Sequence, residues 1–340
     1  MKKLYIIIFL MFVVLVSTYF FVKVKNIQSP RDIQSKNNDC IISGHIIDVS
    51  KYDLDTVTGR QSYYDFLLTK RACEIWSIWD VAIARANPNE LSTVVAALGY
   101  VLSIDNISDD MYKIISDRLY DDQRSEVEKS GIISVLLYAK SPLSVKHLIT
   151  FAKLIEENKN KTSKSPNLLS EDIGAIKEIY MSLVDGGRNW SLSPVFESEW
   201  RDIGDNELSQ TTTVIGDALG YLSKPSGVDI LIDTMANTSK NSIKYKVAMN
   251  AISNLSTNDS TETVLAPALI KYKNNDDIIK TVIRGLLSID SADSVIAVML
   301  YADSIKNSNT DYYKWIKSEL IKSKKDEVKK VVSNWLVSGK

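Results

Sequence analysis

Ala218-Leu-Gly-Tyr-Leu222, Ala251-Ile-Ser-Asn-Leu255 and Gly285-Leu-Leu-Ser-Ile289 are three copies of one pattern in the C-terminal half of the chain. A short polar link follows each copy, and then comes an apolar run, at 228–235, 264–269 and 295–300. The copies begin 33 and 34 positions apart, a spacing that indicates stacked pairs of helices. Apolar residues recur at i, i+3 and i+4 in both parts, so each unit is predicted as helix, turn, helix. One such pair cannot bury its apolar face alone, which predicts that neighbouring pairs stack.

These units resemble HEAT-like (armadillo-type) α-helical repeats, and we expect the chain to be a bacterial-type, membrane-anchored protein of this kind. The resemblance covers residues 210–305 closely and 72–200 loosely, where Ala97-Leu-Gly-Tyr100 repeats the tetrad Ala218-Leu-Gly-Tyr221. It implies an all-α fold, a right-handed α-solenoid of stacked helical hairpins over 63–340, with the clearest repeats at 207–308. It also implies protein binding by an extended curved surface, without catalytic residues. The usual ladder of Arg or Asp at fixed repeat positions is missing, so the resemblance identifies no subfamily.

The N-terminus carries an apolar segment that is long enough to cross a membrane. After Met1-Lys-Lys3, the 19 residues Leu4–Val22 hold no ionisable group apart from two tyrosines. About 20 apolar residues span a bilayer, so 1–25 are predicted as a single-pass transmembrane signal-anchor in the inner membrane. A signal peptide that is cleaved after Thr18 is the alternative. A three-residue tail is easily retained inside, so we expect the C-terminal bulk in the periplasm, or otherwise outside the cytoplasm.

The charge balance argues against nucleic acid as a partner. Residues 1–26 hold four of the 41 basic residues and none of the 42 acidic ones, so the remainder has a formal net charge of −5. Binding to nucleic acid needs a basic stripe that neutralises phosphates, and an acidic body does not supply one.

Residues 26–62 are predicted as a linker, with a short extended segment at 40–48. Cys40 and Cys73 are the only cysteines. Outside the cytoplasm we expect such a pair to form a disulfide, and two separate buried thiols are the alternative. His45 has no acidic or cysteine cluster beside it, so we expect it neither to bind a metal nor to act as a base.

Tryptophans mark two further segments. The segment 188–205 contains Trp190 and Trp200 without a clear helical period, and it is predicted as a long aromatic loop. Such a loop either binds a partner through these two side chains or covers an open end of the core. Trp76 and Trp79 either form a platform for a sugar or, at this helical spacing, belong to the core.

The second helices of the three clear units carry acidic residues. In HEAT-like arrays the second helix of each pair lines the concave face, and by resemblance that face would present Asp229, Asp233, Glu262 and Asp293. An acidic groove would recruit a basic protein. The alternative is that these carboxylates belong to ordinary solvated helix faces. Pro267 is predicted to bend the second helix of the middle unit, because proline removes a backbone donor.

The last segment, 309–340, is predicted as two helices, one capped by Asn309 or Thr310 and one by Ser323. It is rich in lysine, which suits the polar outer face of a terminal repeat. A patch that faces the membrane or an acidic partner is the alternative. The lysines are Lys314, Lys317, Lys322, Lys324, Lys325, Lys329 and Lys330.

No motif of an enzyme is present: the chain has no Gly-rich phosphate loop, no Gly-x-Ser-x-Gly and no His-Glu-x-x-His, and only two histidines. We therefore predict no catalytic residue, no cofactor and no bound metal. A minor alternative is a helical toroid that acts on glycans with paired carboxylates. The pairs are Asp109-Asp110, Asp121-Asp122 and Asp276-Asp277. Aspartates at helix boundaries are also common because they cap helices and favour the positive end of the helix dipole.

These observations favour a non-catalytic scaffold of the cell envelope, which holds another protein at the outer face of the inner membrane. An immunity or inhibitor protein that neutralises a toxin delivered to the periplasm is the alternative. Both need a membrane-anchored, mildly acidic binding protein, and the sequence leaves its oligomeric state open.

Overall fold

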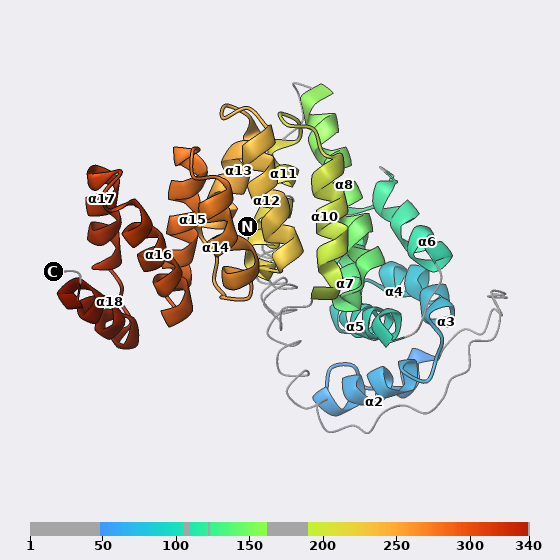
Figure 1. Ribbon diagram of the computed structural model, residues 1–340. Helices are drawn as coiled ribbons and strands as arrows, with labels where there is room; N and C mark the ends of the chain where they lie inside the picture. The colour runs from blue at the N-terminus through green and yellow to red at the C-terminus, as the bar shows by residue number, and fades with distance from the viewer. Residues whose placement is uncertain (1–47, 105–108, 122, 162–189, 339–340) are drawn as a thin grey trace, which may run out of the picture. The chain divides into compact units, whose positions relative to one another are not determined.

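The chain is all-helical wherever its structure is described. A computed structural model describes residues 48–104, 109–121, 123–161 and 190–338, without the side chains of 158–161 and 338, and these ranges contain no β-strand (Figure 1). This confirms the predicted all-α class. The predicted anchor at 1–25, Cys40 and His45 lie outside the described residues.

The helices form two compact units that divide between Phe151 and Ala152. In the described part of the chain, the first unit begins with a 3-10 turn, and α-helices follow it. Its elements are η1 (Val49–Lys51), α2 (Val57–Leu67), α3 (Ala72–Ser77), α4 (Trp79–Arg85), α5 (Pro88–Ile104), α6 (Asp109–Tyr120), α7 (Glu126–Ala139) and the first part of α8 (Pro142–Lys161). Both η1 and the start of α2 fall within the predicted linker 26–62, so the folded part begins earlier than the sequence suggested.

Helix α5 is the centre of the first unit, where it packs against α2, α3, α4 and α7. Leu98 and Val94 on this helix are fully buried, and burying a side chain of this kind contributes about 1.5–3 kcal/mol. Asn87 caps the start of α5, since its Oδ1 accepts the backbone N–H of Asn89 at 2.9 Å. Pro88 occupies the first position, where its missing N–H would have no helical partner.

The second unit contains the three predicted repeats. Its elements are the end of α8, η2 (Trp190–Leu192), α10 (Ser193–Asp202), α11 (Ser209–Leu222), α12 (Pro225–Asn237), α13 (Ile243–Ser253), η3 (Thr261–Leu265), α14 (Ala266–Lys271), α15 (Asp276–Ile289), α16 (Ala292–Ile305), α17 (Thr310–Leu320) and α18 (Asp326–Ser338). Each predicted unit is a helical pair, namely α11 with α12, α13 with η3 and α14, and α15 with α16. This agrees with the periods of the sequence.

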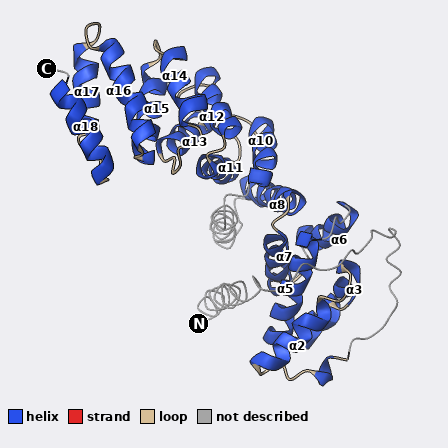
Figure 2. Ribbon diagram, turned by 60° about the horizontal axis from the view of Figure 1, so that its bottom comes forward, coloured by secondary structure: helices blue, strands red, loops and turns tan. Residues whose placement is uncertain are grey.

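The first and the second helices of these pairs form separate rows. Helices α11, α13 and α15 pack against one another in order, and α12, η3–α14 and α16 do the same. Figure 2 shows one row on each side of the unit. Glycine allows the first helices to approach closely, because a Cβ on Gly285 would lie 2.4 Å from the carbonyl oxygen of Ile252. A Cβ on Gly220 would lie 2.9 Å from the carbonyl oxygen of Ala251.

The second helix of the middle pair changes type along its length. Residues Thr261–Leu265 form a π-helical turn, in which the backbone N–H of Leu265 donates to the carbonyl of Ser260 at 2.9 Å. The α-helical part follows, with Pro267 in its first turn. Proline has no N–H and its ring clashes with the carbonyl four residues before it. The predicted irregularity at Pro267 is therefore a wide turn directly before the proline.

Two predictions about local structure are wrong. The segment 188–205 is not a loop along its length, because Ser193–Asp202 form α10. Leu192, Phe196 and Trp200 recur at every fourth position and are all buried, which gives this helix its core side. Ser323 does not cap the last helix, which begins at Asp326; its hydroxyl donates instead to a carboxylate oxygen of Asp290 at 2.6 Å.

Candidate functional site

The second helices of the three pairs turn a mixed acidic and apolar side to solvent. On α16, Asp293, Ile296 and Leu300 follow one another at i, i+3 and i+7, and all three are exposed. The buried residues of this helix, such as Val295 and Val298, lie on its opposite side. The stripe on α16 therefore points directly away from the core.

The neighbouring second helices, α12 and η3–α14, also carry acidic or apolar residues that reach solvent. Asp229 and Asp233 lie on α12 at i and i+4, and Glu262 and Ile270 are exposed on η3 and α14. Leu300 and Ile270 are 66 % and 75 % exposed, although isoleucine and leucine are usually buried. We call this set on α12, η3–α14 and α16 the second-helix face; all of its members are exposed except Asp233, which is half-buried. Its members are Asp229, Asp233, Glu262, Ile270, Asp293, Ile296 and Leu300.

Charge is unevenly divided between the two rows of helices. Helices α12, η3–α14 and α16 carry five acidic residues and one lysine, whereas α11, α13 and α15 carry three acidic and four basic residues. Exposed large apolar side chains follow the same division, because within 209–305 they occur only on α14 and α16. Acidic and exposed apolar side chains are therefore both concentrated in the row of second helices.

Most carboxylates of the second-helix face are free to meet a partner. Among the described residues, Asp229, Glu262 and Asp293 form no ion pair and accept no side-chain hydrogen bond. Asp233 differs, since it accepts a hydrogen bond from the hydroxyl of Tyr272 at 2.8 Å and pairs with Lys271 at 3.3 Å. The sequence placed all four residues on second helices correctly but gave no sign of the contact at Asp233.

The two tryptophans of the predicted aromatic loop have different surroundings. Trp200 is 1 % exposed, and its indole N–H donates to Thr234 Oγ1 at 2.8 Å. The ammonium of Lys244 lies 5.6 Å from the ring centre and donates to the carbonyl of Ile203, and burial lowers the pKa of this lysine. Trp200 therefore belongs to the core. Trp190 remains 39 % exposed, although its N–H donates to the carbonyl of Leu222.

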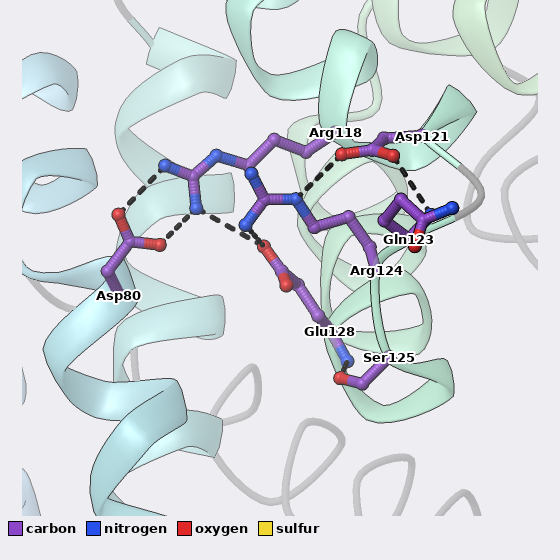
Figure 3. Close-up of polar contacts among 7 residues, drawn as sticks. All are labelled: Asp80, Arg118, Asp121, Gln123, Arg124, Ser125 and Glu128. Atoms are coloured by element: carbon purple, nitrogen blue, oxygen red, sulfur yellow. Dashed lines mark hydrogen bonds and ion pairs between the residues drawn. The ribbon is translucent and has the colours of Figure 1, made fainter.

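A polar cluster in the first unit joins α4, α6 and α7 (Figure 3). Arg118 on α6 reaches both carboxylate oxygens of Asp80 on α4, and its Nη1 lies 3.2 Å from Oε1 of Glu128 on α7. Arg124 donates to Asp121 at 3.0 Å and lies 3.8 Å from Glu128. The hydrogen bonds from Arg118 hold the pKa of the Asp80 carboxyl below its usual value. Because its charged groups satisfy one another, we interpret this cluster as a clamp between helices.

The same cluster contacts the tryptophan pair Trp76 and Trp79. Trp79 is fully buried, and its ring stacks on that of Trp76 with centres 5.2 Å apart. The guanidinium of Arg118 lies 5.1 Å from the Trp76 ring centre. Trp79 therefore belongs to the core, whereas Trp76 is half-buried between this indole and the cation.

His147 contacts three side chains of α6, which the sequence analysis did not predict. Its Nδ1 lies 3.2 Å from the hydroxyl of Tyr120, its Nε2 lies 3.9 Å from Asp109, and its ring stacks in parallel with Tyr112. Burial lowers the pKa of His147, while the negative charge of Asp109 opposes this effect. The sequence alone does not indicate the contacts of His147, because its partners on α6 lie about 30 positions earlier in the chain.

The described members of the paired carboxylates lie at helix starts or beside a cation. Asp109 and Asp110 lie in the first turn of α6, and Asp276 and Asp277 lie in the first turn of α15, where the helix dipole favours them. Asp121 is held by Arg124, and its neighbour in the sequence lies outside the described residues.

Further features of the sequence concern cysteine, metal and the membrane. Cys73 lies on α3, whereas Cys40 is outside the described residues, so the disulfide between them stays a prediction. Across the described ranges, no group of three or more His, Cys, Asp or Glu side chains is placed to hold a metal ion. None of the described helices has both the length and the apolar composition needed to cross a membrane.

Comparisons of the chain with protein-family models, with curated proteins and with solved structures find no match.

Proposed function

We propose that this chain is a scaffold of the cell envelope that binds another protein, without catalysis, through the second-helix face. The observation that carries the proposal is the shared location of exposed acidic and exposed apolar side chains on α12, η3–α14 and α16. Apolar side chains supply binding energy once they are covered, and unpaired carboxylates select a basic partner. The expected partner therefore presents apolar side chains between lysines or arginines.

The ordered contacts between successive helices support a HEAT-like solenoid as the arrangement of the second unit. In such an array each pair adds one second helix to a continuous face, so the binding surface grows with the number of pairs. With an anchor at 1–25, as the sequence predicts, this face would be held close to the outer surface of the inner membrane.

The test is photo-crosslinking in the full-length chain, with a photoreactive phenylalanine analogue in place of Ile296. We expect a defined crosslinked protein with a basic surface. The matched control places the same analogue at Asn250, an exposed position on α13 in the row of first helices. Equal crosslinking of the same protein at Asn250 would contradict the second-helix face. One partner bound tightly would favour the immunity function, and several partners bound weakly would favour the scaffold.

Charge reversal then tests the selection of the partner. The variant Asp229→Lys, Glu262→Lys, Asp293→Lys removes three free carboxylates from the second-helix face. We expect slower association and a weaker dependence on salt, because the steering charges are lost. A control variant with the same change in net charge carries Asp65→Lys, Asp117→Lys and Glu126→Lys, all exposed in the first unit. Equal loss in both variants would show a general charge effect and would reject the proposed face.

A further inference from the structure

The C-terminal end of the second unit has the opposite charge to the second-helix face. Residues Thr310–Ser338 carry seven lysines and four acidic residues, so this end is basic, while α12, η3–α14 and α16 are acidic. Its ion pairs are local contacts between residues three positions apart, such as Lys322 with Glu319 at 2.6 Å and Lys329 with Asp326 at 2.9 Å. Lys324 and Lys330 are exposed and form no ion pair among the described residues. We call α17, α18 and the link between them the lysine-rich end.

Apolar side chains are also exposed at this end. Ile321, in the link, is 62 % exposed, and Val337 on α18 is 73 % exposed. Val337 lies on the same outward side of α18 as Lys330, seven positions earlier. The lysine-rich end therefore has the two properties that the second-helix face requires of its partner, namely exposed apolar side chains beside unpaired positive charges.

These two surfaces belong to one rigid unit, because α16 packs against both α17 and α18. The lysine-rich end is thereby fixed beside the second-helix face and leaves Leu300 exposed, so it does not cover the face of its own copy. A second copy, turned by a two-fold rotation, would place its lysine-rich end on the first copy's face and receive the first copy's end on its own. In such a closed dimer, the second-helix face and the lysine-rich end of each copy are both covered by the other copy.

We propose that the second-helix face binds the lysine-rich end of a second copy of this chain, so that the protein forms a two-fold dimer. This goes beyond the binding of another protein, which would compete with the second copy for the same face. Because the contact joins opposite charges at the surface, it weakens as the salt concentration rises.

The test is sedimentation velocity of the full-length chain in detergent, at several protein and salt concentrations. We expect a dimer at low salt whose dissociation constant rises at least about tenfold in high salt. A chain that stays monomeric at about 100 µM in low salt would overturn the dimer. It would leave the proposed function intact, since crosslinking at Ile296 to another protein does not need a second copy.

Two charge-reversal variants distinguish loss of the specific contact from loss of folding. The first variant is the triple reversal Asp229→Lys, Glu262→Lys, Asp293→Lys, which makes both surfaces basic. The second is Lys322→Glu, Lys324→Glu, Lys330→Glu, which makes both surfaces acidic. Each variant alone is expected to dimerise at least about tenfold more weakly than the native chain, because like charges now meet. An equal mixture restores the dimer, since each face meets an end of opposite charge; a mixture that stays monomeric would reject the proposal.

Discussion

Glu156 holds the start of a helix that begins 53 positions later in the chain. Its carboxylate accepts the backbone N–H of Thr211 at 3.0 Å and the hydroxyl of the same residue at 2.9 Å. It also accepts the backbone N–H of Gln210 at 2.9 Å. The residue before α11 is Leu208, which has a positive φ and offers no capping side chain. A carboxylate from α8 thus replaces the local cap that most helices obtain from Ser, Thr, Asp or Asn.

We expect Glu156→Ala to lower the free energy of unfolding by about 1–3 kcal/mol, because the buried N–H groups of α11 lose their acceptor. Urea denaturation followed by circular dichroism measures this change. The matched control is Glu157→Ala, since Glu157 is exposed and should change stability by about 0.5 kcal/mol or less. Equal effects of the two substitutions would show that the cap contributes nothing.

Gly285→Ala is expected to push α13 and α15 apart. The added Cβ would lie 2.4 Å from a backbone oxygen, which cannot move aside as a flexible side chain can. Overpacking of this kind costs about 1–3 kcal/mol of stability. Gly227→Ala is the control, because its Cβ would meet the end of the Leu219 side chain at 3.2 Å and alanine favours a helix. Thermal unfolding at one protein concentration compares the two, and an unchanged stability of Gly285→Ala would contradict the close approach.

Arg118→Met should destabilise the first unit by about 1–3 kcal/mol, since Glu128 is almost fully buried and loses its nearest donor. Asp80→Asn should cost less, about 0–1 kcal/mol, because the Asp80 side chain is 63 % exposed and water replaces the contact. Chemical denaturation of both variants gives the difference. A larger loss for Asp80→Asn would mean that the contact with α4, rather than that with α7, holds the clamp together.

His147 is expected to make stability fall as the pH drops below about 6.5. Burial lowers its pKa in the folded chain below 6.5, so the unfolded chain binds the proton first as the pH falls. The stabilisation is therefore complete above pH 6.5 and is lost as the pH falls through the folded pKa. His147→Phe, made with His45→Gln to leave no second histidine, should lose less stability over this range. An identical pH profile in the variant and in its His45→Gln parent would contradict the prediction.

The cysteine prediction can be tested without further structure. If Cys40 and Cys73 are bridged, thiol labelling of the denatured, unreduced chain finds no free thiol. In the chain-entropy description, a bridge over a loop of this length stabilises the fold by about 3–4 kcal/mol. Two labelled thiols per chain would show that the bridge is absent.

Periodic apolar residues made the three helical pairs predictable from the sequence. Local signals of this kind also gave Asn309 as the cap of α17, where its Oδ1 accepts the N–H of Tyr312 at 3.1 Å. The spacing of Leu192, Phe196 and Trp200 at every fourth position indicates the α10 helix. The segment was instead predicted as a loop because of its tryptophans. The spacing was present in the sequence and was missed.

Contacts between distant residues could not be found in the same way. The polar run that begins at Glu156 resembles a loop, yet α8 continues to Lys161, and this carboxylate is buried against α11. The partners of Arg118 and His147 likewise come from separate helices. Without aligned relatives, no pattern in a single sequence relates such positions, so the polar contacts emerge only when the helices are packed.

The π-helical turn at Thr261–Leu265 implies a tolerance to the deletion of one residue at this one place. A turn closed between residues five apart holds one residue more than an α-turn, the same as the difference between the repeat spacings of 33 and 34. A length change elsewhere in a packed helix rotates every following side chain by about 100°. Here a one-residue deletion at Thr263 can instead tighten the wide turn and leave Ala268 and Leu269 facing the core. In-frame deletions of a single codon should therefore survive selection at this turn far more often than within α13 or α15.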